Sequence, residues 1–497
     1  MIGILLIPVI TAVTCYILSN TRLISYISAL GAAVLAIFSI PTIVSSVSAP
    51  IEMMNGMLYM DALSGYIMAL IIFLGFASAL YSIAYIEHEL KAGLTDITGT
   101  RRYYSLLHLF IFTMLLVTMS NNLALMWIAI EATTIVSAVL IGFGVRKRAL
   151  AIEAAWKYII LCTVGITFAL LGTFITYYAS TAVLGTEGTL NWTALKGIAN
   201  KLNPSTMKLA FIFILVGYGT KAGLAPVHNW LPDAHSQAPS PISALLSGIL
   251  LNTAFYGIMR FVSIVEPSTG VIFTGNLLIV FGLISIGISS IFILVQDNYK
   301  RLLAYSSIEH MGIITLGTGI GGALGIYGAL LHVLNHALSK PLLFFASGRI
   351  QAHYGSTKIE NVTGVLSSMP LLGTLTFIGV LSIAGTPPFN IFLSEFTILK
   401  AGADKGLWTV VGLFLFFVVI VFYGVLSGFG KMLFGKNILT SHPRGFSSSK
   451  SLGSGFSTLC SNSIMIVMAS LIIVLGFTIP GFIDSTIRAC INILGVK

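Results

Sequence analysis

Ionisable side chains are scarce in this sequence, and two of them stand alone inside long apolar runs. Lys221 is the only charged residue in 209–227, and Glu131 is the only ionisable residue in 122–144. A charged group inside a membrane span is costly, so such residues are rare and usually take part in ion transfer. As a pair, a lysine and a glutamate could bind and release protons, each stabilising the charge on the other.

Both residues also have a purely structural interpretation. The amine of Lys221 could reach the lipid headgroups, although it lies 12 residues into its apolar run, about 18 Å along a helix that rises ~1.5 Å per residue. Burial favours the neutral form of a carboxyl group, so Glu131 could be neutral and hydrogen-bonded to the hydroxyl groups of Thr133, Thr134 and Ser137. The rarity of ionisable groups inside spans favours function over these alternatives.

A second group of titratable residues lies in 330–348. His332, His336 and Lys340 are spaced four residues apart, which places them on one stripe of a helix, over about 12 Å of its length. Histidine exchanges protons near neutral pH, so this stripe could relay protons. The alternative is a polar seam that holds neighbouring helices together through hydrogen bonds.

Three further residues could join such a path. Glu395 lies in an apolar segment, where it could act in ion transfer or pair with Lys400. Glu309 and His310 are adjacent, so on a helix their side chains point about 100° apart. We therefore expect that they cannot both line one path without a kink.

Two of the apolar runs contain proline where a continuous helix would be expected. Pro226 follows three glycines and removes the N–H partner of the carbonyl of Ala222. Pro387 and Pro388 interrupt the run that leads to Glu395. Discontinuous helices beside charged residues are common at the ion-binding sites of transporters, so both runs are predicted to be broken helices.

The elements that position these residues are membrane helices. Of the 497 residues, 56% are hydrophobic and 8% are charged, and the mean hydropathy is +0.98, which excludes an ordinary soluble domain. We predict an all-α polytopic membrane protein with about fourteen transmembrane helices of ~20 residues each. The predicted spans are 2–19, 23–45, 62–86, 103–119, 122–143, 155–180, 208–228, 241–264, 271–295, 302–320, 323–348, 368–399, 407–430 and 463–484.

The seventh and twelfth predicted spans carry the proline breaks, at corresponding places in two blocks of five spans. Paired interruptions of this kind predict two inverted five-helix repeats. The predicted domains are 1–102 with the first three spans, 103–264 as the first repeat, 265–434 as the second repeat, and 435–497 with a cytoplasmic loop and the last span.

Basic residues are distributed unevenly between the two sides of the predicted membrane. Fifteen Lys and Arg residues follow odd-numbered spans, and seven follow even-numbered spans. The positive-inside rule therefore predicts that the odd loops are cytoplasmic, including a Ser/Gly-rich loop at 437–458, and that both termini are outside. The net charge of +10 is explained by these loops and not by a nucleic-acid partner. We expect a multi-pass protein of the cell membrane.

The number and spacing of the cysteines indicate which metal cofactors this chain could bind. The four cysteines form no C-x-x-C pair, which excludes the usual ligand sets of iron–sulfur clusters and structural zinc. No dinucleotide fingerprint and no P-loop is present. We predict no cofactor and no metal site in this chain, so any electron transfer would occur on another subunit.

Some charged groups near the ends of spans are interpreted as structural. Asp61 is predicted to cap the third span, and Arg260 is predicted to extend toward the outer surface. Glu153 and Lys157 are predicted to form an i,i+4 ion pair.

Several motifs together resemble the proton-conducting antiporter-like family, which includes large membrane subunits of complex I, Mrp-type cation/proton antiporters and membrane arms of energy-converting hydrogenases. They cover roughly 103–400 and read EATT at Glu131, GTKAGLAPVHNWLPDAHSQAPSPISALLSG at 219–248, DNYKRLLAYSSIEHMG at 297–312, LLHVLNHALSKPLLFFASG at 330–348 and GTPPFNIFLSEF at 385–396. EATT, YSSIEHMG and SEFTILKAG are most similar to component F of hydrogenase-4 and formate hydrogenlyase complexes.

This resemblance implies fourteen helices, two inverted repeats and a polar axis along the middle of the membrane. It implies that Glu131 pairs with Lys221 and that Lys340 and Glu395 continue the path.

The eighth span departs from the family pattern. Ser247 and Asn252 stand where many relatives carry Lys or His, so the link between the two halves would depend on water or on His332. Asn252 is therefore a further candidate for the path, as is His228 in the motif after Lys221.

Three functions remain open from the sequence. The chain could be an ion-translocating subunit of a complex I-like or hydrogenase-type oxidoreductase, moving H⁺ or exchanging H⁺ for Na⁺, with a cytoplasmic redox module on partner subunits. It could belong to a gradient-driven Mrp-type cation/proton antiporter. It could also be a non-conducting membrane anchor of a partner complex, which the buried ionisable residues argue against.

Overall fold

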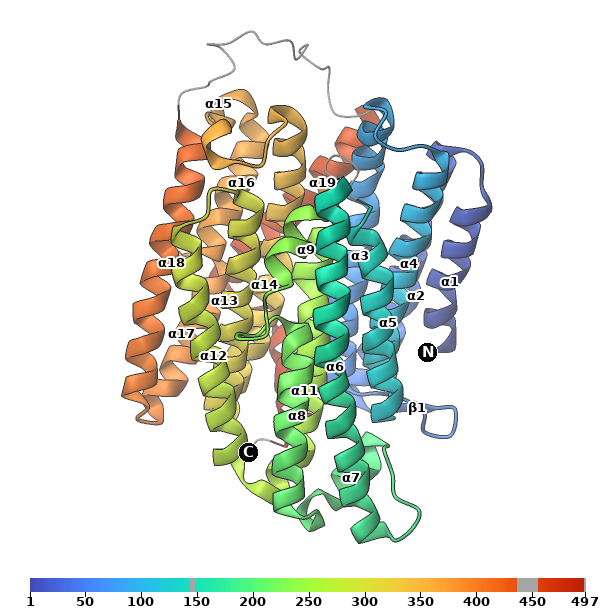
Figure 1. The fold of residues 1–497 in the computed structure, drawn as a ribbon, viewed down its shortest axis with the longest axis vertical. Helices are drawn as coiled ribbons and strands as arrows, with labels where there is room; N and C mark the ends of the chain where they lie inside the picture. Colours follow the sequence, from blue (N-terminus) through green and yellow to red (C-terminus); the bar gives the residue numbers. More distant parts are fainter. Residues whose placement is uncertain (144–147, 436–454, 496–497) are drawn as a thin grey trace.

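The computed structural model describes residues 1–143, 148–435 and 455–495. Its helices lie side by side along the long axis of the molecule (Figure 1). Within these ranges, ten helices are long and apolar enough to cross a membrane. The chain is thus a largely helical membrane protein, as predicted. The predicted Ser/Gly-rich loop, except for its last residues, lies outside the described part.

The N-terminal part contains three helices and a short antiparallel hairpin. Its elements are α1 (Ile2–Ile17), α2 (Thr21–Ser48), β1 (Ile51–Met53), β2 (Leu58–Met60) and α3 (Ala62–Lys91). The hairpin pairs Ile51 with Met60, and it lies at the same end of the bundle as α7 (Figure 1).

The next part carries Glu131 and Lys221 and contains a broken helix. Its elements are α4 (Ile97–Met119), α5 (Leu123–Ile141), α6 (Arg148–Leu184), α7 (Trp192–Ile198), the 3₁₀-helix η1 (Ala199–Lys201), α8 (Pro204–Ala222), α9 (Leu231–Gln237), α10 (Ser240–Leu245), the π-helical turn η2 (Leu246–Leu250) and α11 (Leu251–Thr269). Helices α10 and α11 are continuous through η2.

The remaining part carries the histidines, Lys340 and Glu395. Its elements are α12 (Val271–Leu294), α13 (Tyr299–Ile320), α14 (Gly322–Tyr354), the 3₁₀-helix η3 (Ile359–Asn361), α15 (Val365–Ser368), α16 (Pro370–Ile383), α17 (Asn390–Asp404), α18 (Trp408–Phe434), α19 (Gly455–Phe477) and α20 (Gly481–Leu494). Helix α20 was not predicted, and α19 ends seven residues before the predicted end of the last span.

Both predicted breaks are present. Helix α8 ends at Ala222, where Gly223 adopts φ = 76° and its N–H caps the last turn. Helix α16 ends at Ile383, and Gly385 adopts φ = +66° before the two prolines. A glycine with positive φ is the usual way to end a helix, and proline prevents its continuation. The sequence therefore shortens α8 and α16 and leaves helix ends inside the bundle.

The core of the bundle is built from two helical segments that have no exposed face. The most apolar window of α10–α11 and that of α14 are completely buried, whereas only 22% of the corresponding window of α18 is buried. Helix α14 packs against α13, α16 and α17, and α8 packs against α6 and α11. Polar residues in the buried window of α14 and in the last turn of α8 are therefore shielded by other helices.

The prediction that Arg260 extends to the surface is wrong. Its guanidinium group is buried and donates two hydrogen bonds to Asp61, at 2.6 and 2.7 Å. It also donates to the hydroxyl oxygens of Ser64 at 2.8 Å and Tyr256 at 2.9 Å. Asp61 caps α3 as predicted, by accepting from the N–H of Ser64 at 3.0 Å. The ion pair keeps the arginine inside by joining α11 to α3.

Candidate functional site

Lys221 lies in the last turn of α8 and is completely buried. Its ammonium group donates to the hydroxyl oxygen of Thr134 at 2.9 Å and to that of Tyr158. It also lies 4.5 Å from the centre of the Tyr158 ring, a cation–π distance. In the described part of the chain, no carboxylate makes an ion pair with it. The lysine is therefore stabilised by hydroxyl groups and an aromatic face.

Glu131 lies on α5 and is half-buried. One carboxylate oxygen accepts from the hydroxyl of Thr163 at 2.9 Å, and the other accepts from the hydroxyl of Thr134 at 3.2 Å. The direct ion pair with Lys221 that the resemblance implied is therefore not present. Instead, Thr134 accepts from the lysine and donates to the glutamate, so one hydroxyl group connects the two charged residues.

Tyr158 extends this first cluster, which comprises Glu131, Thr134, Tyr158 and Lys221. Its hydroxyl is 2.7 Å from that of Ser137 on α5. Its ring centre lies 4.8 Å from that of Trp230, in the segment that follows the α8 break. From the sequence, Thr134 was expected only as a partner of a neutral glutamate, and Tyr158 was not predicted. Tyr158 precedes Lys221 by 63 positions, so no local pattern indicated the contact.

His332, His336 and Lys340 share one stripe of α14, and all three are fully buried. The ammonium group of Lys340 donates to the carbonyl oxygen of Leu303 at 3.1 Å and to the hydroxyl of Ser306. Within the described residues it has no direct carboxylate partner. Lys340 is thus held in the same manner as Lys221, by neutral oxygens in the core.

His310 of α13 joins the histidine stripe. Its Nδ1 is 3.0 Å from Nε2 of His332, and its ring centre is 5.4 Å from that of His336. The Oε2 of Glu309 lies 3.8 Å from Nε2 of His310. Although Glu309 and His310 are adjacent on α13, the ends of their side chains thus lie close together.

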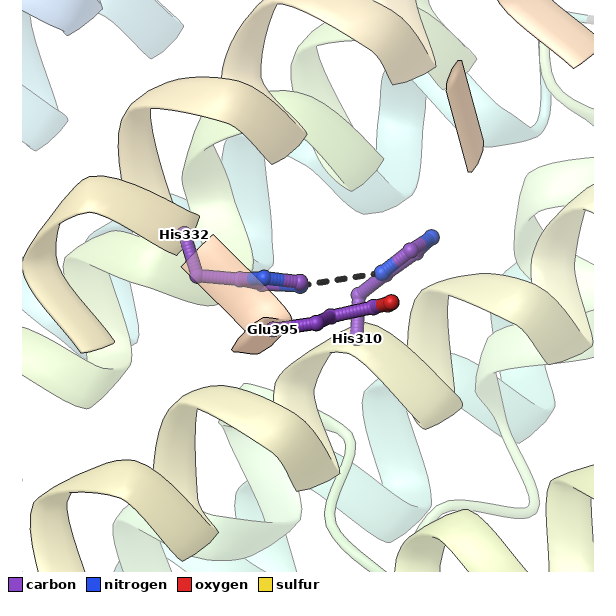
Figure 2. A group of neighbouring side chains, drawn as sticks. All are labelled: His310, His332 and Glu395. Carbon is purple, nitrogen blue, oxygen red and sulfur yellow. Dashed lines mark hydrogen bonds between the residues drawn. The ribbon is translucent and has the colours of Figure 1, made fainter. Parts of the chain in front are cut away.

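Glu395 lies on α17 and is only 5% exposed. It borders the second break: a Cβ atom on Gly385 would come within 2.4 Å of its Oε2. Lys400, its alternative partner, instead pairs with Asp404 at 2.8 Å. Glu395, His310 and His332 converge from three helices, and each offers a ligand atom within 4.8 Å of the others (Figure 2). The sequence named all three residues as candidates for one path but did not predict that they would group as metal ligands.

Asn252 and two serines lie among the buried polar residues of the segments between the two lysines. Nδ2 of Asn252 is 2.9 Å from the carbonyl oxygen of Gly248 and 3.3 Å from Nδ1 of His336. Ser247 and Ser307 are joined by a 2.7 Å hydrogen bond. Residues 246–250 form the π-helical turn η2, a feature frequent at functional sites. Asn252, named as a candidate, therefore reaches the histidine stripe.

His235 was missed by the sequence analysis. It is fully buried, and neither ring nitrogen has a hydrogen-bond partner in the described structure. Its ring centre lies 5.9 Å from that of Trp230 and 6.0 Å from that of Phe344 on α14, so it stands between the first cluster and the stripe. His228, a named candidate, is also buried, and its Nδ1 has no partner. The motif at 219–248 contains both His228 and His235. The sequence alone does not show which of the two lies beside α14.

The fold and these buried groups define a class of protein, an antiporter-like membrane subunit with ionisable residues inside a helical bundle. The sequence family described as "NADH:quinone oxidoreductase/Mrp antiporter, TM" matches residues 120–422. This match covers more than half of the chain, and the chain belongs to that family.

The similarity extends to individual relatives. The hydrogenase-4 component F homolog of Methylacidiphilum infernorum (isolate V4) is 42% identical over 368 residues, which are 72% of this chain and 77% of that protein. The NADH-quinone oxidoreductase subunit N of Desulforudis audaxviator (strain MP104C) is 31% identical over 357 residues, 71% of this chain and 68% of that protein. A chain of the membrane-bound sulfane sulfur reductase, an archaeal respiratory membrane complex, is 26% identical, with a TM-score of 0.83 over 99% of this chain and 97% of that chain. These relatives are membrane subunits of multi-subunit complexes.

Proposed function

We propose that this chain translocates protons, or exchanges H⁺ for Na⁺, as a membrane subunit of a complex I-like or energy-converting hydrogenase-type complex. Electron transfer on a cytoplasmic redox module of partner subunits would drive the movement. The chain itself would hold no redox centre. Its similarity to the hydrogenase-4 component F homolog supports this assignment over a stand-alone antiporter.

The observation that carries the proposal is that two buried lysines are held by neutral oxygens. Lys221 contacts Thr134 and Tyr158, and Lys340 contacts Ser306 and Leu303. Removing an ammonium group from water favours its neutral form unless a charge partner compensates. Hydroxyl groups accept from an ammonium and donate to a neutral amine. The hydroxyl partners of both lysines are therefore compatible with gain and loss of a proton.

Thr134 would act as part of a switch in the first half, because it is hydrogen-bonded to both Glu131 and Lys221. When the carboxylate of Glu131 lies close, its negative charge favours a protonated Lys221. When it withdraws toward Thr163, the lysine loses that stabilisation and releases its proton. The hydrogen bond between Glu131 and Thr163 supports such a withdrawn position. An ion pair that opens and closes would couple the site to events elsewhere in the complex.

The second half continues the path. From the first cluster, protons would pass by His235 to His336 and Lys340, then by His332 and His310 to Glu395. Glu309, whose carboxylate lies 3.8 Å from the imidazole of His310, would take the role that Glu131 has in the first half. The unpaired ring nitrogens of His235, His310 and His336 support the presence of water along this route.

We further propose fourteen membrane crossings arranged as two inverted five-helix repeats, 103–264 and 265–434, flanked by 1–102 and 435–497. The packing of α4 on α5 and of α6 on α8 has counterparts in α12 on α13 and α14 on α16, which supports the repeats. The charge bias favours cytoplasmic odd loops and outer termini in the cell membrane.

A gradient-driven cation/proton antiporter is the second candidate, because the matching family includes Mrp antiporter subunits. The two candidate functions predict different partner subunits. Native purification should recover iron–sulfur or nickel–iron subunits with this chain, whereas small antiporter subunits alone would support the second candidate. The isolated chain should contain no stoichiometric nickel, iron, flavin or haem.

The test of ion transfer is proton or sodium uptake into vesicles, normalised to the amount of assembled complex. Lys221→Met should abolish uptake, because methionine cannot hold a proton. Lys221→Arg should also fail, because arginine does not release its proton. A wild-type rate in Lys221→Arg would show that this residue need not deprotonate and would overturn the mechanism.

A further inference from the structure

We propose that His310, His332 and Glu395 form a binding site for a divalent transition-metal ion, with Zn²⁺ as the best match. The blocking effect expected from the bound metal rests on the proposed ion transfer, but the binding itself does not. The three residues come from α13, α14 and α17 and meet at one point in the bundle (Figure 2).

The spacing of the ligand atoms fits a metal ion with small adjustment. The facing ring nitrogens, Nδ1 of His310 and Nε2 of His332, are 3.0 Å apart. Two nitrogens bound to tetrahedral zinc at ~2.0–2.1 Å are about 3.3 Å apart. All three ligand atoms lie within 4.8 Å of one another, so Glu395 would move by an ångström or two. Two imidazoles and one carboxylate leave a fourth position open, as in catalytic zinc sites.

The chemistry of the ligands selects the class of ion. Imidazole nitrogen suits zinc, copper, iron and nickel, whereas calcium and magnesium prefer sites made only of oxygen. A sodium ion, a hard cation without strong affinity for nitrogen, would be poorly served by two histidines. The ligands therefore favour a transition-metal ion over Na⁺, and the same three residues lie on the proposed proton path.

A surrounding shell already orients the two histidines. The Nδ1 of His332 is 2.9 Å from the hydroxyl of Ser394, which in turn accepts from Asn335 at 3.1 Å. The Nε2 of His310 has no hydrogen-bond partner in the described structure, but a carboxylate oxygen of Glu309 lies 3.8 Å away. Metal-bound histidines usually donate their other ring N–H to such a group. A small movement of Glu309 would complete this arrangement.

The second helix break offers a route of entry. Glu395 is buried directly behind Gly385, which has no side chain to cover it, and Pro387 and Pro388 are exposed. The carboxylate is thus the ligand nearest to the outside of the described chain. It could bind an arriving cation first and pass it to the two histidines.

A bound metal would stop the relay. Each ligating nitrogen must be deprotonated to bind, and it then cannot accept a proton. The hydrogen bond between His310 and His332 would be lost, and the two rings would be fixed on either side of the ion. Zn²⁺ should therefore inhibit ion transfer at the concentration at which it occupies this site.

The test measures metal binding to the intact purified complex. Wild-type and variant complexes are equilibrated with Zn²⁺, separated from free metal, and analysed for zinc per complex. Glu395→Gln and His332→Ala should each bind one zinc ion fewer than wild type. His336→Asn is the matched control, because it removes another buried imidazole from the same stripe and should bind as many ions as wild type.

Two further readouts test the site without relying on transport. The difference between the zinc X-ray absorption spectra of the wild-type and Glu395→Gln complexes should show an ion with two imidazole ligands. Ser394→Ala should weaken zinc affinity by about 10- to 100-fold. Equal zinc content in wild type, Glu395→Gln and His332→Ala would overturn the proposal, as would loss of the ion in His336→Asn. If Lys221→Arg transports normally, the ion-transfer mechanism fails while the binding result still decides the metal site.

Discussion

The hydroxyl group of Thr134 gives the sharpest prediction, because it is hydrogen-bonded to both Glu131 and Lys221. Thr134→Val keeps the size and shape of the side chain but removes this oxygen. The lysine then loses its 2.9 Å hydrogen bond, and the glutamate loses its 3.2 Å hydrogen bond. Both charged groups keep one other partner, Tyr158 and Thr163 respectively, so the helices should remain packed.

The expected effect follows from the energy of these bonds. A hydrogen bond to a charged group contributes about 1.5–3 kcal/mol. If the hydroxyl stabilises only one of the two positions of the switch, its loss changes the barrier by about that amount. Each 1.36 kcal/mol corresponds to a factor of ten in rate, so ion transfer should fall roughly 10- to 150-fold. The long contact to Glu131 favours the lower part of this range.

The assay is ion uptake into vesicles at equal content of assembled complex. Thr133→Val is the matched control: its hydroxyl is also buried, and in the described structure it donates to the carbonyl of Ile130 at 2.6 Å and contacts neither charged residue, so uptake should stay within about twofold of wild type. Thr134→Ser should keep most of the activity, because it restores the oxygen. Wild-type uptake in Thr134→Val would refute the bridging role of this residue.

The other predictions concern the stripe, the structural ion pair and the orientation. Replacing both His332 and His336 with Ala should lower vesicle uptake at least tenfold with the complex still assembled on native gels; unchanged uptake would leave the stripe as a structural seam. Asp61→Asn leaves a buried guanidinium unpaired and should destabilise the chain by about 3–5 kcal/mol, measured as earlier thermal unfolding, whereas Asp404→Asn at an exposed pair should cost under about 1 kcal/mol; equal effects would contradict this reasoning. Arg148→Cys, in a background without other reactive cysteines, should react with an impermeant label only from the cytoplasmic side; labelling from outside would reverse the orientation.

Much of the helical framework follows from local sequence. Apolar runs of the right length predicted the long helices, and glycine followed by proline predicted where α8 and α16 end. The i,i+4 pair of Glu153 and Lys157 is present at 2.6 Å. Helix α20 escaped prediction because it is amphipathic and short, with polar Asp484 and Arg488 inside it, so it lacks the continuous apolar run that marks a span.

The functional residues could be identified individually, but their partners could not. Rarity alone indicated Glu131, Lys221 and Lys340. Whether two of them touch depends on helix packing, and packing inserts Thr134 between the first two. The prediction that Arg260 reaches the surface was wrong for the same reason, because its partner Asp61 lies 199 positions away in the sequence. An arginine near the end of a span resembles a surface residue until its buried carboxylate is known.

Buried polar groups are arranged in one way around Arg260 and in another way around the histidines. Around Arg260, donors and acceptors are matched by short hydrogen bonds, so moving any group would leave a buried charge unpaired at a cost of several kcal/mol. Along the proposed path the pattern is reversed. In the described residues, His235 has neither nitrogen bonded, and His310, His336 and Glu309 each have one free atom. Such unsatisfied groups are destabilising in a dry core, but they leave open positions for protons and water. In the described residues, the polar groups around Arg260 are fully paired, whereas the proposed ion path includes several side chains that are not.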